Sequence, residues 1–315
     1  MILGFIKPTY PGEKRVALLP NHITADFENE LIVEDGYGSN LAIKNAEYES
    51  KGCRIESRER IYKECDTVFC LKLIQPADYD YLRNGQMIIG WTHPTGSGSY
   101  FYKSIAAEKQ LKIIDLDNIY PTANIGDSHI PISFIKKNFV WKNSFYAGVS
   151  SVQHALLHFG MYPNSETKIA VLACGSCSQG AYSYISKYNA DVRMFYRKTM
   201  SEFYETIGDY DIIINGIEVD GTGAHIITKA DLQRIKRGCL IIDSAADAGN
   251  AIEGTRYMTI DNPMYEEDGL FFYEVNNAPS LLYRTTSFEI SKSFSEWVYK
   301  KDVKRFWELF ENKID

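Results

Sequence analysis

Residues 168–181 read KIAVLACGSCSQGA, and this stretch decides the fold. The apolar, β-branched run predicts a buried strand over Lys168–Leu172, small residues follow it, and a helix is expected over Ala181–Lys187. A strand, a turn of small residues and a helix form the phosphate cradle of a dinucleotide-binding fold. In such a cradle, backbone N–H groups at the helix start face the pyrophosphate, and only small side chains let it approach.

The turn departs from the dinucleotide pattern Gly-x-Gly-x-x-Gly, because Ala173, Gly175 and Ser178 occupy the three glycine positions. Taken alone, it fits an ordinary tight strand–helix connection equally well. Read as a cofactor site, the turn predicts phosphate binding by Ala173, Gly175, Ser176, Cys177 and Ser178.

The next expected strand, Asp191–Tyr196, ends at Arg197, Lys198 and Thr199. In NAD-binding proteins an acidic residue about 20 positions beyond the glycine-rich turn holds the ribose 2′-hydroxyl. Arg197 takes that place here, and a guanidinium grips a 2′-phosphate through paired, charge-assisted hydrogen bonds. The alternative is a solvated basic turn, but the joint pattern favours NADPH as the cofactor.

Around this motif, short apolar runs alternate with amphipathic segments, which predicts an α/β fold with two Rossmann-like domains and parallel sheets. The segment Ile23–Phe27 is expected to form either a short helix or a turn. The segment Asp117–Asn143 is read as an irregular crossing loop. It precedes a helix over Ser144–Gly160 with Ser144 as its N-cap, and further strands are expected at Ile212–Asn215 and Leu240–Asp243.

The composition is that of a soluble globular protein, with 45% hydrophobic and 24% charged residues. The net charge is −7, and no basic stripe that would bind nucleic acid stands out. No apolar run approaches the roughly 20 residues that span a bilayer. The N-terminus does not resemble a signal peptide, so a cytoplasmic location is expected. Six cysteines are too few for a disulfide scaffold, and we expect no metal site. A redox role for Cys174 and Cys177 stays open beside simple packing in a tight turn.

Five residues could carry chemistry, because ligands of parallel sheets bind at the carboxyl ends of strands. Arg15 follows the first strand, where it could clamp a carboxylate or pair with Glu13 at the surface. Lys72 interrupts an apolar strand, so it either extends to solvent or faces an anion. His93 follows the next strand and could relay a proton, or bond a backbone group. Asp243 and Asp247 end a strand of the second region.

With Arg15, Lys72, a Thr-His-Pro turn at His93 and an Asp-Ala-Gly turn at Asp247, the chain resembles the alanine dehydrogenase and saccharopine dehydrogenase superfamily. Within it, the chain is most similar to the opine-type carboxyethylornithine synthase family. This resemblance implies NADPH-dependent reductive condensation of pyruvate with the side-chain amine of ornithine or lysine. It also implies a catalytic domain of residues 1–143 completed by helices in 279–315, an NADP(H)-binding domain of residues 144–278, an interdomain cleft and a homo-oligomer.

Carried over by position, Arg15 and Lys72 would bind the keto acid and His93 would be the general acid and base. Asp247 would lie beside the nicotinamide and the amine, and Asn277 and Arg284 would lie near the cofactor. Two alternatives remain at this point: an amino-acid dehydrogenase that uses ammonia, and a non-catalytic NADPH-binding protein.

Overall fold

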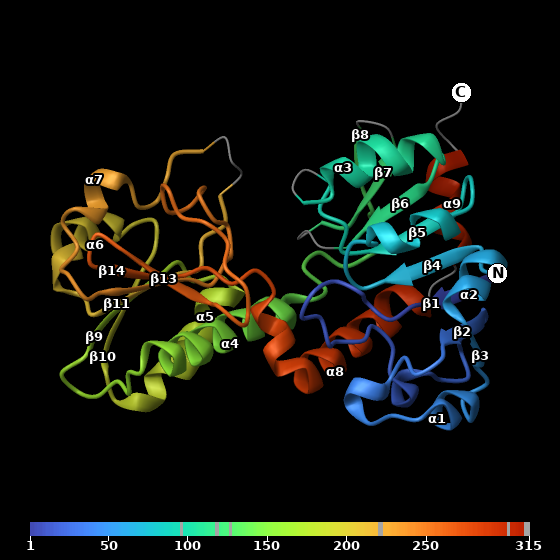
Figure 1. Cartoon of the computed structure of the whole chain (residues 1–315), viewed down its shortest axis with the longest axis horizontal. Helices are drawn as coiled ribbons and strands as arrows, with labels where there is room; N and C mark the ends of the chain where they lie inside the picture. The colour runs from blue at the N-terminus through green and yellow to red at the C-terminus, as the bar shows by residue number, and fades with distance from the viewer. Residues whose placement is uncertain (95–96, 117–119, 126–127, 220–222, 301–302, 312–315) are drawn as a thin grey trace. The chain divides into compact units, whose positions relative to one another are not determined.

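The computed structural model describes residues 1–94, 97–116, 120–125, 128–219, 223–300 and 303–311. Within them, the chain divides into two compact units (Figure 1). Unit 1 comprises Met1–Val140 and Tyr283–Asp315, and unit 2 comprises Trp141–Leu282. Each unit has its own sheet and hydrophobic core, so each is described by itself.

The described part of unit 1 contains an eight-stranded sheet in the order β3-β2-β1-β4-β5-β6-β7-β8. The strands are β1 (Ile2–Phe5), β2 (Glu30–Glu34), β3 (Arg54–Glu56), β4 (Thr67–Cys70), β5 (Met87–Gly90), β6 (Lys112–Asp115), β7 (Thr122–Ile125) and β8 (Ser128–Pro131). Strands β1 to β6 are parallel, whereas β7 and β8 are antiparallel additions. The carboxyl ends of β1, β4 and β5 therefore meet at one edge.

The C-terminal segment completes the core of unit 1. Helices α1 (Asn45–Glu49), α2 (Arg58–Glu64) and α3 (Ser99–Phe101) come from the first part of the chain, and α8 (Tyr283–Phe294) and α9 (Lys304–Glu311) from the end. Phe5 and Phe69 stack at 4.9 Å, and Tyr299 meets both rings edge-on, at 5.0 and 4.8 Å. Such aromatic contacts add roughly 0.5–1.5 kcal/mol each beyond the area that they bury.

Unit 2 has, among its described residues, a six-stranded sheet in the order β10-β9-β11-β12-β14-β13. The strands are β9 (Lys168–Leu172), β10 (Asp191–Phe195), β11 (Ile212–Asn215), β12 (Leu240–Asp243), β13 (Met264–Glu267) and β14 (Leu270–Tyr273). All are parallel except the edge strand β13. Both units thus confirm the predicted α/β fold with parallel-dominated, Rossmann-like sheets.

The helices of unit 2 are α4 (Trp141–Phe159), α5 (Ser176–Ile185), α6 (Met200–Thr206) and α7 (Lys229–Leu232). Figure 1 shows α4 and α5 side by side, in green. A Cβ atom on Gly148 would lie 1.9 Å from the Cys177 carbonyl oxygen, and one on Gly180 would lie 1.8 Å from that of Phe145. Only glycine at both positions lets the two helix backbones approach this closely.

Several predicted elements are wrong. The segment Asp117–Asn143 contains β7 and β8, although its residues 117–119 and 126–127 lie outside the described ones. Helix α4 begins at Trp141, so Ser144 lies inside it and does not cap it. Helix α5 begins at Ser176, five residues before the expected Ala181. Within Ile23–Phe27 the chain forms a turn at residues 25–26, which is one of the two expectations for that segment.

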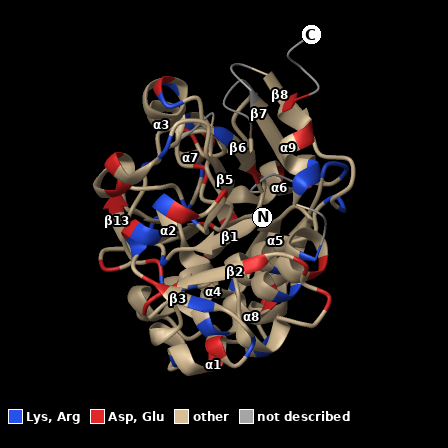
Figure 2. Ribbon diagram, turned by 90° about the vertical axis from the view of Figure 1, so that its right-hand side faces the viewer, with Lys and Arg blue, Asp and Glu red and all other residues tan. Residues whose placement is uncertain are grey.

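Basic residues (Lys, Arg) and acidic residues (Asp, Glu) are interspersed along the described ribbon (Figure 2). None of the described helices has the length and hydrophobicity that a membrane crossing requires.

Candidate active site

The loop after β1 carries a buried ion pair. Arg15 is 1% exposed; its Nε donates to Oε1 of Glu13 at 2.7 Å and its Nη2 to Oε2 at 2.6 Å. Burial raises the pKa of Glu13, but the charge and hydrogen bonds of Arg15 and the charge of Lys72 outweigh it, so the pKa is lowered. Arg15 therefore does pair with Glu13, but inside the protein and not at its surface.

Lys72 and His93 leave the sheet of unit 1 at the same edge. The prediction that Lys72 lies inside a strand is wrong, because β4 ends at Cys70. His93 follows β5, the neighbour of β4, and the adjacent parallel strands place Lys72 Nζ 3.4 Å from His93 Nε2. An ammonium only donates, so in this contact Nε2 is the acceptor and carries no proton.

The Trp91 ring lies near both Lys72 and Arg15. Its ring centroid lies 5.7 Å from Lys72 Nζ and 5.1 Å from the Arg15 guanidinium carbon. Tyr10 adds a second ring at 5.7 Å from Lys72 Nζ. Lys72 is only 7% exposed, so its charge faces aromatic rings, His93 and the Glu13–Arg15 pair, with little water around it. The site is suited to an anion with a carboxylate and a carbonyl oxygen.

Backbone contacts fix the turn that presents His93. His93 has φ +45°, a left-handed conformation that costs a non-glycine residue roughly 1–3 kcal/mol. Asp115, which is fully buried, accepts from the Thr92 N–H at 2.9 Å and from its hydroxyl at 3.1 Å. The Gly98 N–H donates to the His93 carbonyl at 2.9 Å. Hydrogen bonds to Thr92 and to the His93 carbonyl thus hold the turn.

In unit 2, the turn after β9 has the form of a phosphate cradle. Ala173 has φ +73°, and its N–H donates to the Phe195 carbonyl at 2.6 Å. Gly175 precedes the first residue of α5, and a Cβ built on it meets nothing within 4 Å. Open space therefore surrounds the residue directly before the first N–H groups of α5, which begin at Ser176.

Two predicted phosphate-binding side chains are engaged inside the protein. The Ser178 hydroxyl is buried and donates to the Leu172 carbonyl at 2.7 Å. The Cys177 thiol donates to the Ser244 carbonyl at 3.1 Å, and burial raises its pKa. Cys174 is exposed, and both cysteines are free thiols in the described structure. The prediction concerns backbone N–H groups, and those of Ser176, Cys177 and Ser178 open α5 after Gly175, so phosphate binding here stays a prediction.

The basic turn follows β10, which pairs directly with β9. Arg197 and Lys198 are exposed and form no ion pair within the described part of the chain. The Thr199 hydroxyl accepts from the Tyr196 N–H at 3.1 Å, and so shapes the turn. Two positive charges therefore lie beside the phosphate cradle without an ion-pair partner among the described residues.

Asp243 and Asp247 lie at the carboxyl end of β12. Asn215 Nδ2 donates to Asp243 Oδ1 at 3.0 Å, and burial, with the charge of Asp247, raises the pKa of Asp243 to about 6. Asp247 accepts from the Val219 N–H at 2.8 Å and from Asn250 Nδ2 at 2.7 Å. Both carboxylates are therefore held in fixed orientations.

The remaining two candidates lie in different units. Asn277 of unit 2 is 6% exposed and has φ +106°. Arg284 belongs to unit 1, where it donates to the Leu41 carbonyl at 3.2 Å. Sequence reasoning anticipated the pairing of Glu13 with Arg15 as one of two readings, but placed it at the surface. It missed the roles of Trp91 and Asp115, which have no local signal.

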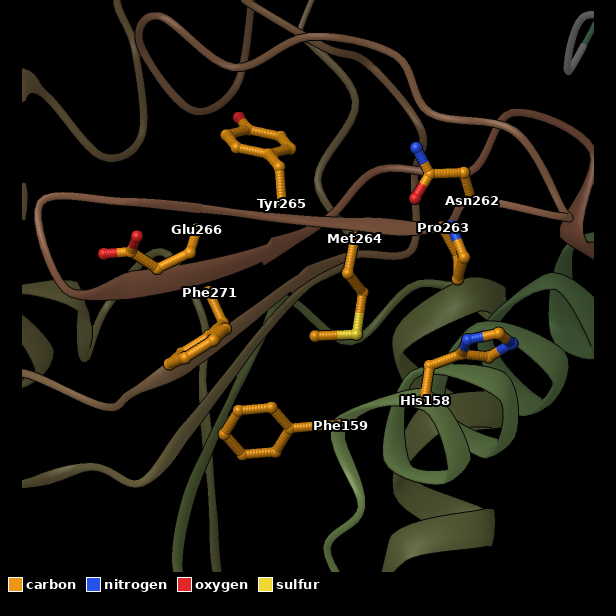
Figure 3. Close-up of a pocket in the computed structure, with 8 residues that line it drawn as sticks. All are labelled: His158, Phe159, Asn262, Pro263, Met264, Tyr265, Glu266 and Phe271. Atoms are coloured by element: carbon orange, nitrogen blue, oxygen red, sulfur yellow. The ribbon is translucent and has the colours of Figure 1, made fainter.

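Two hollows lie away from these residues. One, of about 370 Å³, lies in unit 2 between α4 and the β13–β14 hairpin (Figure 3). Met264 and Phe271 point toward Phe159 there, with the two phenyl rings 5.0 Å apart. Another, of about 450 Å³, is lined in unit 1 by Lys7, Glu34 and Arg58, which are bonded to one another. Neither contains a predicted site residue.

Comparison with known proteins gives a consistent assignment. The N-terminal domain of the alanine dehydrogenase/PNT family matches residues 4–125, and its C-terminal domain matches residues 164–313. An N(5)-(carboxyethyl)ornithine synthase of Clostridium botulinum is 50% identical over 309 residues, covering 98% of this chain and 97% of the relative. One of Lactococcus lactis subsp. lactis is 51% identical over 312 residues, covering 98% of each chain. Alanine dehydrogenase 1 of Staphylococcus aureus is 24% identical, covering 95% and 87%.

Solved structures show the same fold. An L-alanine dehydrogenase superposes with a TM-score of 0.77 at 18% identity, covering 95% of this chain and 89% of the other. A transhydrogenase from Sinorhizobium meliloti superposes with a TM-score of 0.75 at 20% identity, covering 95% and 93%.

Proposed function

The chain belongs to the N(5)-(carboxyethyl)ornithine synthase family, and from that membership we propose that it condenses pyruvate reductively with the side-chain amine of ornithine or lysine, using NADPH. Its alanine dehydrogenase-type domains make it an oxidoreductase. The observation that carries the proposal is the approach of Lys72 to His93, 3.4 Å, beside the buried guanidinium of Arg15.

The residues of unit 2 fit a phosphorylated dinucleotide. The left-handed Ala173, the open position at Gly175 and the start of α5 favour a pyrophosphate. Arg197 and Lys198 would bind the ribose 2′-phosphate that distinguishes NADPH from NADH. When bound, NADPH supplies the hydride that reduces the carbon–nitrogen double bond.

The residues of unit 1 would bind the keto acid and move protons. Arg15, oriented by Glu13, would hold the carboxylate, and Lys72 would donate to the carbonyl oxygen. His93 Nε2 would accept a proton as the amine adds and return it to the hydroxyl that leaves as water. Fixing the reactants in this way replaces a slow encounter in water with an effectively intramolecular step.

Asp247 would orient the amine from unit 2, because both its carboxylate oxygens are already fixed by hydrogen bonds. Its remaining lone pairs can accept from an amine N–H.

Mass spectrometry of the product tests the proposal. Incubation with pyruvate, NADPH and ornithine should give a secondary amine in which a carboxyethyl group is joined to the side-chain nitrogen. Formation of alanine with ammonia, and no adduct with either diamino acid, would assign the protein to the ammonia-using amino-acid dehydrogenases. An absence of any product would favour a non-catalytic NADPH-binding protein.

A further inference from the structure

Two carboxyl groups lie side by side at the carboxyl edge of the unit 2 sheet. Asn215 pairs with Asp243 between β11 and β12, and Ile242 pairs with Tyr273 between β12 and β14. The next step of that register brings Asp243 beside Glu274. Side chains alternate along a strand, so both acids lie on the sheet face of Ile241 and Phe272, which share one core cluster.

The two acids differ in how they are satisfied. Asp243 accepts from Asn215 Nδ2 and from the N–H groups of Ala245 and Asp247. Glu274 is 1% exposed, and neither of its carboxyl oxygens has a hydrogen-bond partner among the described residues. The nearby Thr255 hydroxyl already donates to the Ile252 carbonyl at 2.9 Å. A buried polar group left unsatisfied costs roughly 1–3 kcal/mol, so this arrangement is unfavourable for the protein alone.

A second unsatisfied group lies on the same edge. The Ser244 hydroxyl, directly after β12, is buried without a hydrogen-bond partner in the described structure. The Ser244 carbonyl accepts from the thiol of Cys177, at the start of α5. Within unit 2, the two neighbouring acids Asp243 and Glu274, here called the acidic row, therefore lie next to the cofactor cradle. Polar groups left open beside a cofactor turn indicate a ligand that would complete them.

The charges around Glu274 are acidic. Burial, together with the charges of the nearby Asp243 and Asp247, raises its pKa to about 9, although the Thr255 hydroxyl lowers it. Burial raises the pKa of the Tyr257 and Tyr265 phenols, and the negative charge of Glu274 adds to both shifts. Arg256 is engaged elsewhere, over the Tyr265 ring and with Glu267. The acidic row therefore favours binding of a cation.

An organic cation fits better than a metal ion. Among the residues that the structure describes, no three His, Cys, Asp or Glu side chains are placed to hold a metal. Tyr257 is 54% exposed and Asp247 is half-buried, so the cluster reaches the surface on their side.

We propose that Glu274 binds the ammonium group of the diamino acid that does not take part in the condensation. This inference rests on the proposed function and names the substrate contact that selects a diamino acid. An ammonium has three N–H donors, and the two carboxyl oxygens of Glu274 can accept from them. As the cation binds, the carboxyl O–H of Glu274 breaks, its proton passes to the solvent, and the carboxylate pairs with the ammonium.

The test compares ornithine with 5-aminopentanoate, which keeps the reacting amine and the carboxylate but lacks the second ammonium. Glu274→Gln should lower kcat/KM for ornithine about 10–100-fold, leave that for 5-aminopentanoate unchanged and leave the KM for NADPH unchanged. Glu267→Gln, on the same hairpin and with its side chain 56% exposed, is the matched control and should resemble the parent enzyme.

Calorimetry gives a readout independent of turnover. The binding enthalpy of ornithine, measured in buffers of different ionisation enthalpy, should show release of about one proton in the parent protein and none in the Glu274→Gln variant. An equal loss with both amines, or a raised KM for NADPH alone, together with unchanged proton release, would overturn the role of Glu274. A parent enzyme inactive with ornithine would instead overturn the proposed function.

Discussion

The ammonium nitrogen of Lys72 lies 3.4 Å from Nε2 of His93, although the two residues are separated by a complete strand and its connections. The contact arises because β4 and β5 are parallel neighbours, and each residue follows its strand at the same edge. A cation beside a proton acceptor, both held near Trp91, is what addition of an amine to a keto acid requires.

Replacement of His93 tests its role in proton transfer. His93→Gln should lower kcat about 10²–10⁴-fold, because Gln cannot accept and return a proton. The KM for pyruvate should change little, since Arg15 and Lys72 remain. Steady-state kinetics measure both, with the exposed His158→Gln as control. A variant with nearly full kcat would remove His93 from the mechanism.

Replacement of Glu13 tests the buried ion pair. Glu13→Gln should lower the free energy of unfolding at neutral pH by about 3–5 kcal/mol, because it leaves the buried Arg15 uncompensated. The folded state lowers the pKa of Glu13, so this stabilisation is present above the ordinary carboxyl pKa and is lost as pH falls through the lowered one. Urea unfolding at neutral and acid pH measures the difference.

The control for this experiment is Glu30→Gln, which breaks an exposed ion pair with Arg54. Its effect should stay within about 1 kcal/mol. Equal effects of the two substitutions would show that the Glu13–Arg15 pair contributes no more than a surface contact.

Replacement of Arg197 tests cofactor selection. Arg197→Ala should reduce the ratio of kcat/KM for NADPH to that for NADH about 10–100-fold, since charge-assisted hydrogen bonds to the 2′-phosphate are worth roughly 1.5–3 kcal/mol. Arg193→Ala removes an equal charge from the preceding strand β10, where Arg193 pairs with Glu202, and should leave the ratio unchanged. Equal ratios in both variants would move 2′-phosphate recognition away from Arg197.

The acidic row should also leave a signature in stability. Glu274 has a pKa of about 9 when folded, well above its ordinary value of 4.5. Its folded state therefore binds more protons than the unfolded state between these values, and stability is lost as pH rises toward 9. Glu274→Gln, measured without substrate, should remove this slope and raise the free energy of unfolding near pH 8 by about 1–3 kcal/mol. An unchanged slope would mean that Glu274 ionises normally.

Where the signal is local, the sequence predicts this molecule well. Strands β9, β11 and β12 match their predicted ranges to the residue, because both faces of each are covered and their apolar runs end abruptly at polar turns. The turns after β9 and β10 also lie where short-range spacing predicted them, and their binding of a cofactor stays a prediction. Strands β7 and β8 were missed, because they are short and their polar residues and Pro131 indicate a loop.

Features that depend on neighbouring strands escaped prediction. Nothing local to Ser178 shows that its hydroxyl turns back to Leu172. The row of Asp243 and Glu274 depends on the pairing of β12 with β14, between which β13 intervenes in sequence. Among the described residues, the buried Glu274 carboxyl group has no hydrogen-bond partner. This is a property of the packed unit, so no residue pattern could predict it.

The most direct test of the account is the rate of NADPH oxidation with pyruvate and each of ornithine, lysine and ammonia, repeated with NADH. The account predicts rapid oxidation with a diamino acid and NADPH, and little with ammonia or NADH. Oxidation with ammonia that matches or exceeds the rate with both diamino acids would contradict it.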